Sequence, residues 1–263
     1  MSRDYSKLLD GKTAVVTYGD CAIGRAVAGL FAQHGARVII GVKDADAGQE
    51  IIGNICDASP ESFWLPCDLT DSASVEGFCA EINRRAPLVN ALVNNPWVEF
   101  DTAFEEADEA DDDMLLQAYQ HSIVQTLRAF WPAMLKNERC SVINISYDIA
   151  KGTTPGSNMQ AAASGGKRRS SVSLAVANGA IGGMTRVPAV EGGHHEVRVN
   201  EIQAPFCINA TAGRDADAIR KNAYDVAGAA AKTAAGIANA ALFLASDMAS
   251  YVSGITLHIS AAR

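Results

Sequence analysis

The sequence predicts an α/β fold: one domain in which a doubly wound parallel sheet of about seven strands is flanked by helices. Two observations support this prediction. Along the whole chain, short runs of β-branched apolar residues alternate with segments whose apolar residues recur at helical spacing. In addition, no stretch rich in proline and glycine divides the 263 residues into two parts.

The first predicted unit is a strand, a helix and a second strand. Thr13–Thr17 (TAVVT) is a β-branched run typical of a strand that is buried on both faces. Apolar residues recur at helical spacing in Ile23–His34, and Gly35 follows as a stop signal. Arg37–Val42 (RVIIGV) then completes a right-handed βαβ unit, which is the start of a parallel sheet.

The same alternation continues to the end of the chain. The further predicted strands are Ser62–Leu69, Leu88–Asn94, Ser141–Ser146, Val197–Ile202 and Ile255–Ile259, and the further helices are Ser72–Arg85, Met114–Lys136, Leu174–Val187 and Ala234–Ser246. We therefore expect a single domain over residues 1–263, with an irregular loop inserted at about 151–173, where Gly, Ser, Thr and Ala predominate.

An acidic stretch interrupts this rhythm. Glu99–Asp113 carries nine acidic residues. We interpret it as a solvated loop followed by a helix start, since acidic side chains favour a helix N-terminus. A docking surface for a basic partner is the alternative interpretation.

Composition excludes several classes of function. A formal net charge of −8 and a pI near 5.1 argue against nucleic-acid and anionic-membrane partners. The six cysteines form neither a CxxC pair nor a Cys/His cluster, and His194 and His195 are predicted to lie in a solvated turn, so no metal site is expected. No apolar run approaches the roughly 18–20 residues of a membrane span. The expected location is the cytoplasm.

Eight motifs resemble, in order, those of the short-chain dehydrogenase/reductase family over nearly the whole chain. They are LLDGKTAVVT, GARVIIG, CDLTD, ALVNN, SVINIS, GAIGGMTR, EVRVNEIQAP and FLASDMASYVSG. The resemblance implies a Rossmann-like domain. It also implies a nicotinamide cofactor on a glycine-rich loop and a catalytic set of Ser, Tyr, Lys and Asn.

The glycine-rich loop departs from the family pattern T-G-x-x-x-G-x-G. Tyr18 and Ala22 stand at the first two glycine positions, and only Gly24 remains in register. These glycines let the backbone approach the pyrophosphate at a helix N-terminus. Tyr18 is expected to fill that space, and Asp20 adds negative charge where a phosphate would lie. The alternative is that Gly19 supplies the tight turn at a shifted position in the loop.

The remaining cofactor positions are also altered. Val42 stands where the family has a residue for the ribose or its phosphate, although Lys43 follows it. Asp68 matches the acid beside the adenine ring, and capping of the turn after the strand is an equal explanation for it. Asn94 is retained, but Trp97 replaces a glycine that gives the cofactor room. These changes predict that no cofactor is bound.

The catalytic positions of the family pattern hold other residues. With GAIGGMTR fixing the register, Leu174 stands at the tyrosine position and Asn178 at the lysine position. A register without the loop insertion places Gln160 and Ser164 there instead. Tyr147 occupies the serine position.

The asparagine position completes the set. Counting back from Pro132 puts Tyr119 there. The resemblance therefore implies that the catalytic and cofactor-binding positions are vestigial.

We accordingly expect a non-catalytic subunit that stabilises a catalytically active short-chain dehydrogenase partner in a hetero-oligomer, expected to be a tetramer. This matches heteromeric dehydrogenases of the family in which an inactive subunit pairs with an active one. One alternative is an enzyme with cofactor-independent acid/base chemistry that uses Tyr119, His121, Tyr147 and Lys151. The other is a small-molecule sensor that binds without turnover.

Overall fold

The computed structural model describes residues 6–98, 108–137, 139–148, 172–205 and 223–259. They form one seven-stranded parallel sheet with the strand order β3-β2-β1-β4-β5-β6-β7. The strands are β1 (Thr13–Val16), β2 (Arg37–Val42), β3 (Phe63–Pro66), β4 (Ala91–Asn94), β5 (Ser141–Asp148), β6 (Arg198–Pro205) and β7 (Thr256–His258).

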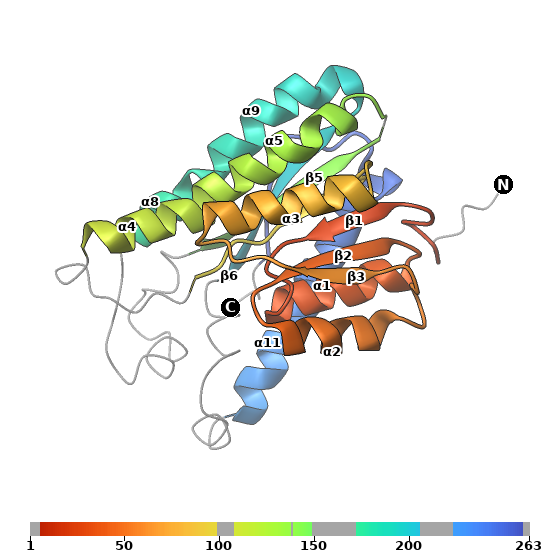
Figure 1. The fold of residues 1–263 in the computed structure, drawn as a ribbon, viewed down its shortest axis with the longest axis horizontal. Helices are drawn as coiled ribbons and strands as arrows, with labels where there is room; N and C mark the ends of the chain where they lie inside the picture. Colours follow the sequence, from red (N-terminus) through yellow and green to blue (C-terminus); the bar gives the residue numbers. More distant parts are fainter. Residues whose placement is uncertain (1–5, 99–107, 138, 149–171, 206–222, 260–263) are drawn as a thin grey trace.

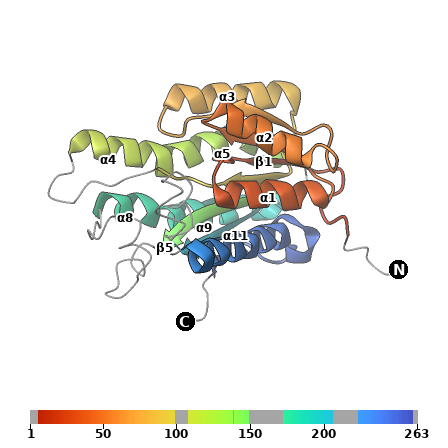
Figure 2. The same ribbon diagram turned by 90° about the horizontal axis from the view of Figure 1, so that it is seen from below.

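Helices cover both faces of the sheet. One face carries α1 (Ala22–Gln33), α2 (Ala45–Ile55) and α11 (Ala223–Ala245), and the other carries α3 (Ser72–Arg85), α5 (Ser122–Met134) and α9 (Ile181–Gly192) (Figures 1 and 2). The helices α4 (Glu109–Leu116) and α8 (Val172–Gly179) extend the second layer beyond the carboxyl ends of the strands. This arrangement confirms the predicted doubly wound α/β fold.

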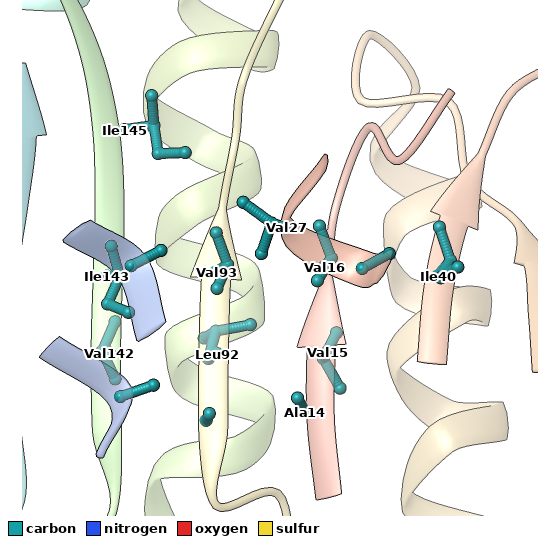
Figure 3. Packing of buried hydrophobic residues seen from close by; sticks show 14 of the residues in the cluster. Ala14, Val15, Val16, Val27, Ile40, Leu92, Val93, Val142, Ile143 and Ile145 are labelled. Carbon is teal, nitrogen blue, oxygen red and sulfur yellow. The ribbon is translucent and has the colours of Figure 1, made fainter. Parts of the chain in front are cut away.

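The core lies between the central strands and the helices on either side. Ala14, Val15 and Val16 of β1 are fully buried and lie beside Leu92 and Val93 of β4 (Figure 3). Such continuous apolar runs are typical of parallel strands that are covered on both faces. They fix the positions from which the loops at the carboxyl ends depart.

One helix was not predicted from the sequence. The α2 segment presents Gly48, Ile51 and Ile55 to the interior at helical spacing, a pattern that the prediction overlooked. Its start is defined by Asp44, whose side chain accepts hydrogen bonds from the backbone amides of Asp46 and Ala47. This is N-capping, which replaces the unmade hydrogen bonds of the first turn.

The predicted helix Met114–Lys136 is longer and is interrupted. It begins at Glu109, because Asp108 and Asp111 form a capping box, and a π-helical turn over Gln117–His121 separates α4 from α5. The end of the acidic stretch is thus a helix start, as predicted, while residues 99–107 lie outside the described residues. Single π turns are frequent at functional sites.

Two further boundaries differ from the predictions. The helix predicted over Leu174–Val187 is two helices, α8 and α9, that meet at Ala180, and α11 starts 11 residues before the predicted Ala234. Of the predicted insertion at about 151–173, residues 151–171 lie outside the described residues, and residues 172–173 belong to α8. Within the described ranges, no helix has both the length and the apolar character needed to cross a membrane.

Candidate active site

The candidate site lies where the chain order reverses in the sheet, between β1 and β4. In open parallel sheets, ligands bind at the carboxyl ends of the strands that flank this point. The two strand ends are joined here, because the amide of Asn95 donates to Thr17 Oγ1 at 2.9 Å. The loops after β1, β2, β3, β4 and β5 all start from this edge.

The loop between β1 and α1 keeps the tight shape that the family pattern requires. Tyr18 adopts a φ of 48°, the left-handed conformation that glycine usually supplies. A Cβ on Gly24 would lie 2.5 Å from the carbonyl oxygen of Tyr18 and 2.6 Å from the Cα of Gly19. The loop backbone thus packs so closely on Gly24 that no side chain fits there. Gly19 packs still more closely on β2, since its Cβ would meet Ile40 Cγ2 at 1.9 Å.

The same loop is tied to β4 by Asn95. Its side-chain nitrogen Nδ2 donates to the carbonyl oxygen of Tyr18 at 3.3 Å and to Cys21 Sγ at 3.1 Å. Cys21 caps α1, since its sulfur accepts from the amide of Gly24 at 3.3 Å. Burial raises the pKa of the Cys21 thiol to about 11, so the thiol stays protonated and its role is structural. Sequence reasoning missed Asn95, although it is the second asparagine of the ALVNN motif.

Asp20 connects the glycine loop to the end of β2. Its Oδ2 accepts from the backbone amides of Lys43 at 3.2 Å and Asp44 at 3.3 Å. Its Oδ1 is buried and has no hydrogen-bond partner within the described part of the chain. Val42, at the family's ribose position, is fully buried and faces the core.

Asp68 follows β3 and has two kinds of partner. Its Oδ1 accepts from the amide of Thr70 at 3.0 Å and the hydroxyl of Thr70 at 2.7 Å, so it caps the turn, as one of the two interpretations held. Its Oδ2 pairs with Lys43 Nζ at 2.7 Å. Burial raises the pKa of the Asp68 carboxyl, but the hydrogen bonds from Lys43 and Thr70 outweigh burial and hold that pKa below its ordinary value.

Asn94 lies in the core beside the cleft. Its side chain is buried and donates to Asn144 Oδ1 at 2.9 Å, while Thr126 Oγ1 donates to Asn94 Oδ1 at 2.8 Å. Asn144 in turn donates to Thr185 Oγ1 at 3.1 Å. This network joins β4 and β5 to α5 and α9, so Asn94 stabilises the scaffold.

Tyr147, at the serine position of the family, places a phenol in the cleft. Its hydroxyl donates to Asn95 Oδ1 at 2.8 Å, which connects it to the glycine loop. Asn178, at the lysine position, fixes the backbone: its Oδ1 accepts from the amide of Tyr147 at 2.8 Å and its amide nitrogen donates to the carbonyl of Tyr147 at 2.7 Å. β4 pairs with β5 only as far as Asn144, so the backbone of Tyr147 has no partner in β4. The side chain of Asn178 makes these backbone hydrogen bonds instead.

Aromatic and apolar side chains surround this phenol. Trp97, which replaces a glycine of the family, packs edge-on against Tyr147 with ring centroids 4.9 Å apart. Leu174, at the tyrosine position, is buried on α8. Tyr119, on the π-helical turn, is fully buried, and burial raises the pKa of its hydroxyl well above the ordinary range.

Not every predicted residue belongs to this cleft. His121 is exposed, and its ring nitrogen Nδ1 lies 3.2 Å from Gln117 Oε1. Lys151, Gln160 and Ser164 lie outside the described residues. His194 and His195 form an exposed turn, and no group of three or more potential metal ligands occurs in the described ranges.

The strand order and the helices on both faces define a doubly wound α/β protein, and comparison with known proteins narrows the class. Residues 19–261 match a family model described as enoyl-(acyl carrier protein) reductase. The 2,5-dichloro-2,5-cyclohexadiene-1,4-diol dehydrogenase LinX of Sphingobium indicum is 28% identical over 253 residues, which covers 95% of each chain. The 3-oxoacyl-[acyl-carrier-protein] reductase FabG of Chlamydia trachomatis is 31% identical over 262 residues, covering 97% of this chain and 98% of the reductase.

A solved structure indicates the same family as these sequence comparisons. A short-chain dehydrogenase/reductase from Burkholderia xenovorans aligns with a TM-score of 0.74 and 27% identity over 97% of both chains. The chain belongs to the short-chain dehydrogenase/reductase family.

These comparisons contradict the predicted non-catalytic subunit. The relatives that the chain matches from end to end are a dehydrogenase and a reductase, so family membership supports oxidoreduction. The prediction was wrong because it took several replaced motif positions together as proof that activity was lost. The structure holds a buried phenol, Tyr147, which Asn95 joins to the loop between β1 and α1. Whether the individual positions are vestigial stays a prediction that no comparison tests.

Proposed function

We propose that this protein is an oxidoreductase that interconverts an alcohol and a carbonyl compound with a nicotinamide dinucleotide. Membership of the family and the two reactions named for its relatives support this proposal. The observation that carries it is the Tyr147 hydroxyl, which is held by Asn95 beside the glycine loop.

The loop retains features that fit a dinucleotide. The backbone turn at Tyr18 leads into the N-terminus of α1, where backbone amides favour a pyrophosphate. Asp20 and Asp68 both contact Lys43, just after the end of β2, where the adenosine of a dinucleotide would bind. A nicotinamide bound in this cleft would supply or accept the hydride.

Tyr147 is the group that would handle the proton. In carbonyl reduction its Oη–H bond would break and the proton would pass to the substrate oxygen, while the carbonyl carbon would gain the hydride. The phenolate left behind regains a proton from solvent, and the reverse steps apply to alcohol oxidation. Asn95 orients the hydroxyl, and Asn178 holds the backbone of Tyr147 so that the ring keeps its place.

Asn178 also marks a difference from the family pattern. A lysine would place a positive charge near the phenol, whereas the amide of Asn178 is neutral. The phenol therefore lacks the neighbouring cation that supports proton transfer in the family pattern.

Replacement of Tyr147 tests the proposal. The purified protein is assayed with oxidised and reduced nicotinamide dinucleotides against panels of secondary alcohols, ketones and 3-oxoacyl thioesters, following nicotinamide absorbance. Tyr147→Phe should lower kcat by about 10²–10⁴-fold and leave the KM for the dinucleotide almost unchanged. Tyr251→Phe, at a fully exposed tyrosine, serves as the control. Equal kcat for Tyr147→Phe and the unmodified protein would refute the assigned role.

Two finer expectations stay predictions. The chain resembles a subunit of the 2-[hydroxy(phenyl)methyl]succinyl-CoA dehydrogenase of anaerobic toluene degradation, so this aryl hydroxyacyl thioester belongs in the panel. Association with a second short-chain dehydrogenase chain is supported by exposed valines on neighbouring helices, Val172 and Val176 on α8 and Val187 and Val190 on α9. Burial of such side chains favours association.

A further inference from the structure

We infer that the indole of Trp97 is a gate over the Tyr147 hydroxyl, so that a substrate reaches this hydroxyl only when the indole turns away. The inference rests on the proposed function, because it names what controls access to the proton donor of the same site. The family pattern has a glycine where this chain has Trp97, so the gate is a feature of this chain's own sequence.

The proton donor is enclosed in the structure. Tyr147 is only 1% exposed, and its hydroxyl donates to Asn95 Oδ1 at 2.8 Å. A general acid has to come within hydrogen-bond reach of the substrate oxygen in order to transfer its proton. A substrate therefore cannot reach the hydroxyl in this conformation, and a neighbouring group has to move.

Tyr147 itself is held in place at both ends. Its backbone lies opposite Ala204 of β6, and the side chain of Asn178 accepts from its amide at 2.8 Å and donates to its carbonyl at 2.7 Å. Asn95 fixes the hydroxyl at the other end of the ring. Displacement of the tyrosine would break these buried hydrogen bonds, which is unfavourable.

The groups that hold the phenol are fixed in turn. Asn95 donates through its backbone amide to Thr17 Oγ1 at 2.9 Å and through Nδ2 to the carbonyl oxygen of Tyr18 at 3.3 Å. Helix α8 carries Asn178, so withdrawal of this helix would break both hydrogen bonds to the backbone of Tyr147. Neither group can open the site at little cost.

Trp97 differs from these groups in what its movement requires. It follows the end of β4, in a segment that forms neither helix nor strand, and its side chain is 5% exposed. Its ring packs edge-on against that of Tyr147, with centroids 4.9 Å apart and an interplanar angle of 69°. Rotation about its side-chain torsions breaks no backbone hydrogen bond of the sheet. The indole can thus open the site while the hydroxyl stays in place.

A gate of this kind has two consequences that can be measured. A reagent modifies a buried group only during the fraction of time in which that group is exposed. A substrate that binds only the open conformation has its apparent affinity lowered by the same fraction. Removal of the indole should therefore raise reagent access to Tyr147 and the kcat/KM for the substrate by similar factors.

Nitration of tyrosines by tetranitromethane, mapped by mass spectrometry, tests the gate without turnover. In the unmodified protein, Tyr147 should react at least about tenfold more slowly than the fully exposed Tyr251. Trp97→Gly should raise the rate at Tyr147 by at least about tenfold and leave the rate at Tyr251 unchanged. Trp97→Phe keeps a smaller ring and should give an intermediate rate. Trp64→Ala is the matched control, since Trp64 packs on Gly48 beside β3, at the far edge of the sheet.

The outcomes separate the gate from the proposed function. Equal nitration of Tyr147 and Tyr251 in the unmodified protein overturns the gate alone, as does unchanged protection of Tyr147 in Trp97→Gly. So does faster nitration without a rise in kcat/KM for an alcohol or ketone that the unmodified protein turns over. If neither protein turns over any alcohol, ketone or 3-oxoacyl thioester of the panel, the proposed function fails together with the gate. Should Trp97→Gly not fold, unchanged protection of Tyr147 in Trp97→Phe overturns the gate, and an intermediate rate supports it.

Discussion

Two buried tyrosines, Tyr119 and Tyr147, differ in what their hydroxyls contact. Tyr147 donates to Asn95 at 2.8 Å, whereas the Tyr119 hydroxyl lies near the backbone of Val98 and makes no hydrogen bond of good geometry within the described ranges. Both were predicted from the sequence to stand at catalytic positions of the family pattern, because neighbouring motifs fixed the register. Their partners could not be predicted, since Asn178 and Asn95 reach Tyr147 from 31 and 52 residues away.

The difference between the hydroxyls predicts opposite effects on stability. Tyr119→Phe removes an unpaired buried hydroxyl and should raise the free energy of unfolding by about 1 kcal/mol. Tyr147→Phe removes a paired hydroxyl and leaves Asn95 Oδ1 without its donor, so the free energy of unfolding should fall by about 1–2 kcal/mol. Urea denaturation of both variants measures these changes in the free energy of unfolding. A marked loss of stability in Tyr119→Phe would mean that its hydroxyl has a partner.

At the scale of elements, the loop between β1 and α1 shows how a changed motif can keep its shape. Tyr18 takes the left-handed conformation of the glycine it replaces, at a cost of roughly 1–2 kcal/mol, and Asn95 holds the loop through the Tyr18 carbonyl and Cys21. A sequence pattern does not contain this backbone conformation, and the expectation that Tyr18 fills the space of a pyrophosphate stays a prediction. Periodicity predicted the strands well, but it missed α2, which a side-chain cap defines, and the π turn in the long helix.

A pair of glycine substitutions on α1 tests the importance of the loop shape. Gly24→Ala places a Cβ 2.5 Å from the Tyr18 carbonyl oxygen, a backbone atom that cannot move cheaply. It should destabilise the protein by about 1–3 kcal/mol and weaken dinucleotide binding. Gly29→Ala meets nothing within 4 Å and should stabilise the helix by roughly 0.5–1 kcal/mol without changing binding. Thermal unfolding and calorimetry compare the stability and the dinucleotide binding of the two variants. Equal effects would show that the close packing of the loop on Gly24 is not important.

At the scale of the whole molecule, the parallel sheet gathers the loops after β1 to β5 at one edge. Alternating strands and helices were enough to predict this sheet and the edge where its site lies, because short parallel connections admit few topologies. Loss of activity was predicted from replaced residues, and the relatives contradict that prediction. The central claim is therefore that the sheet still presents a working dinucleotide cleft.

Titration with reduced nicotinamide dinucleotide tests this claim most directly, because it needs no knowledge of the substrate. Trp97 packs on Tyr147 in the cleft, so bound nicotinamide should quench its fluorescence and gain energy-transfer emission. The account predicts saturable binding with a dissociation constant on the order of micromolar, and an energy-transfer signal that Trp97→Phe removes. Absence of binding at millimolar concentration, in calorimetry as well as fluorescence, would contradict it.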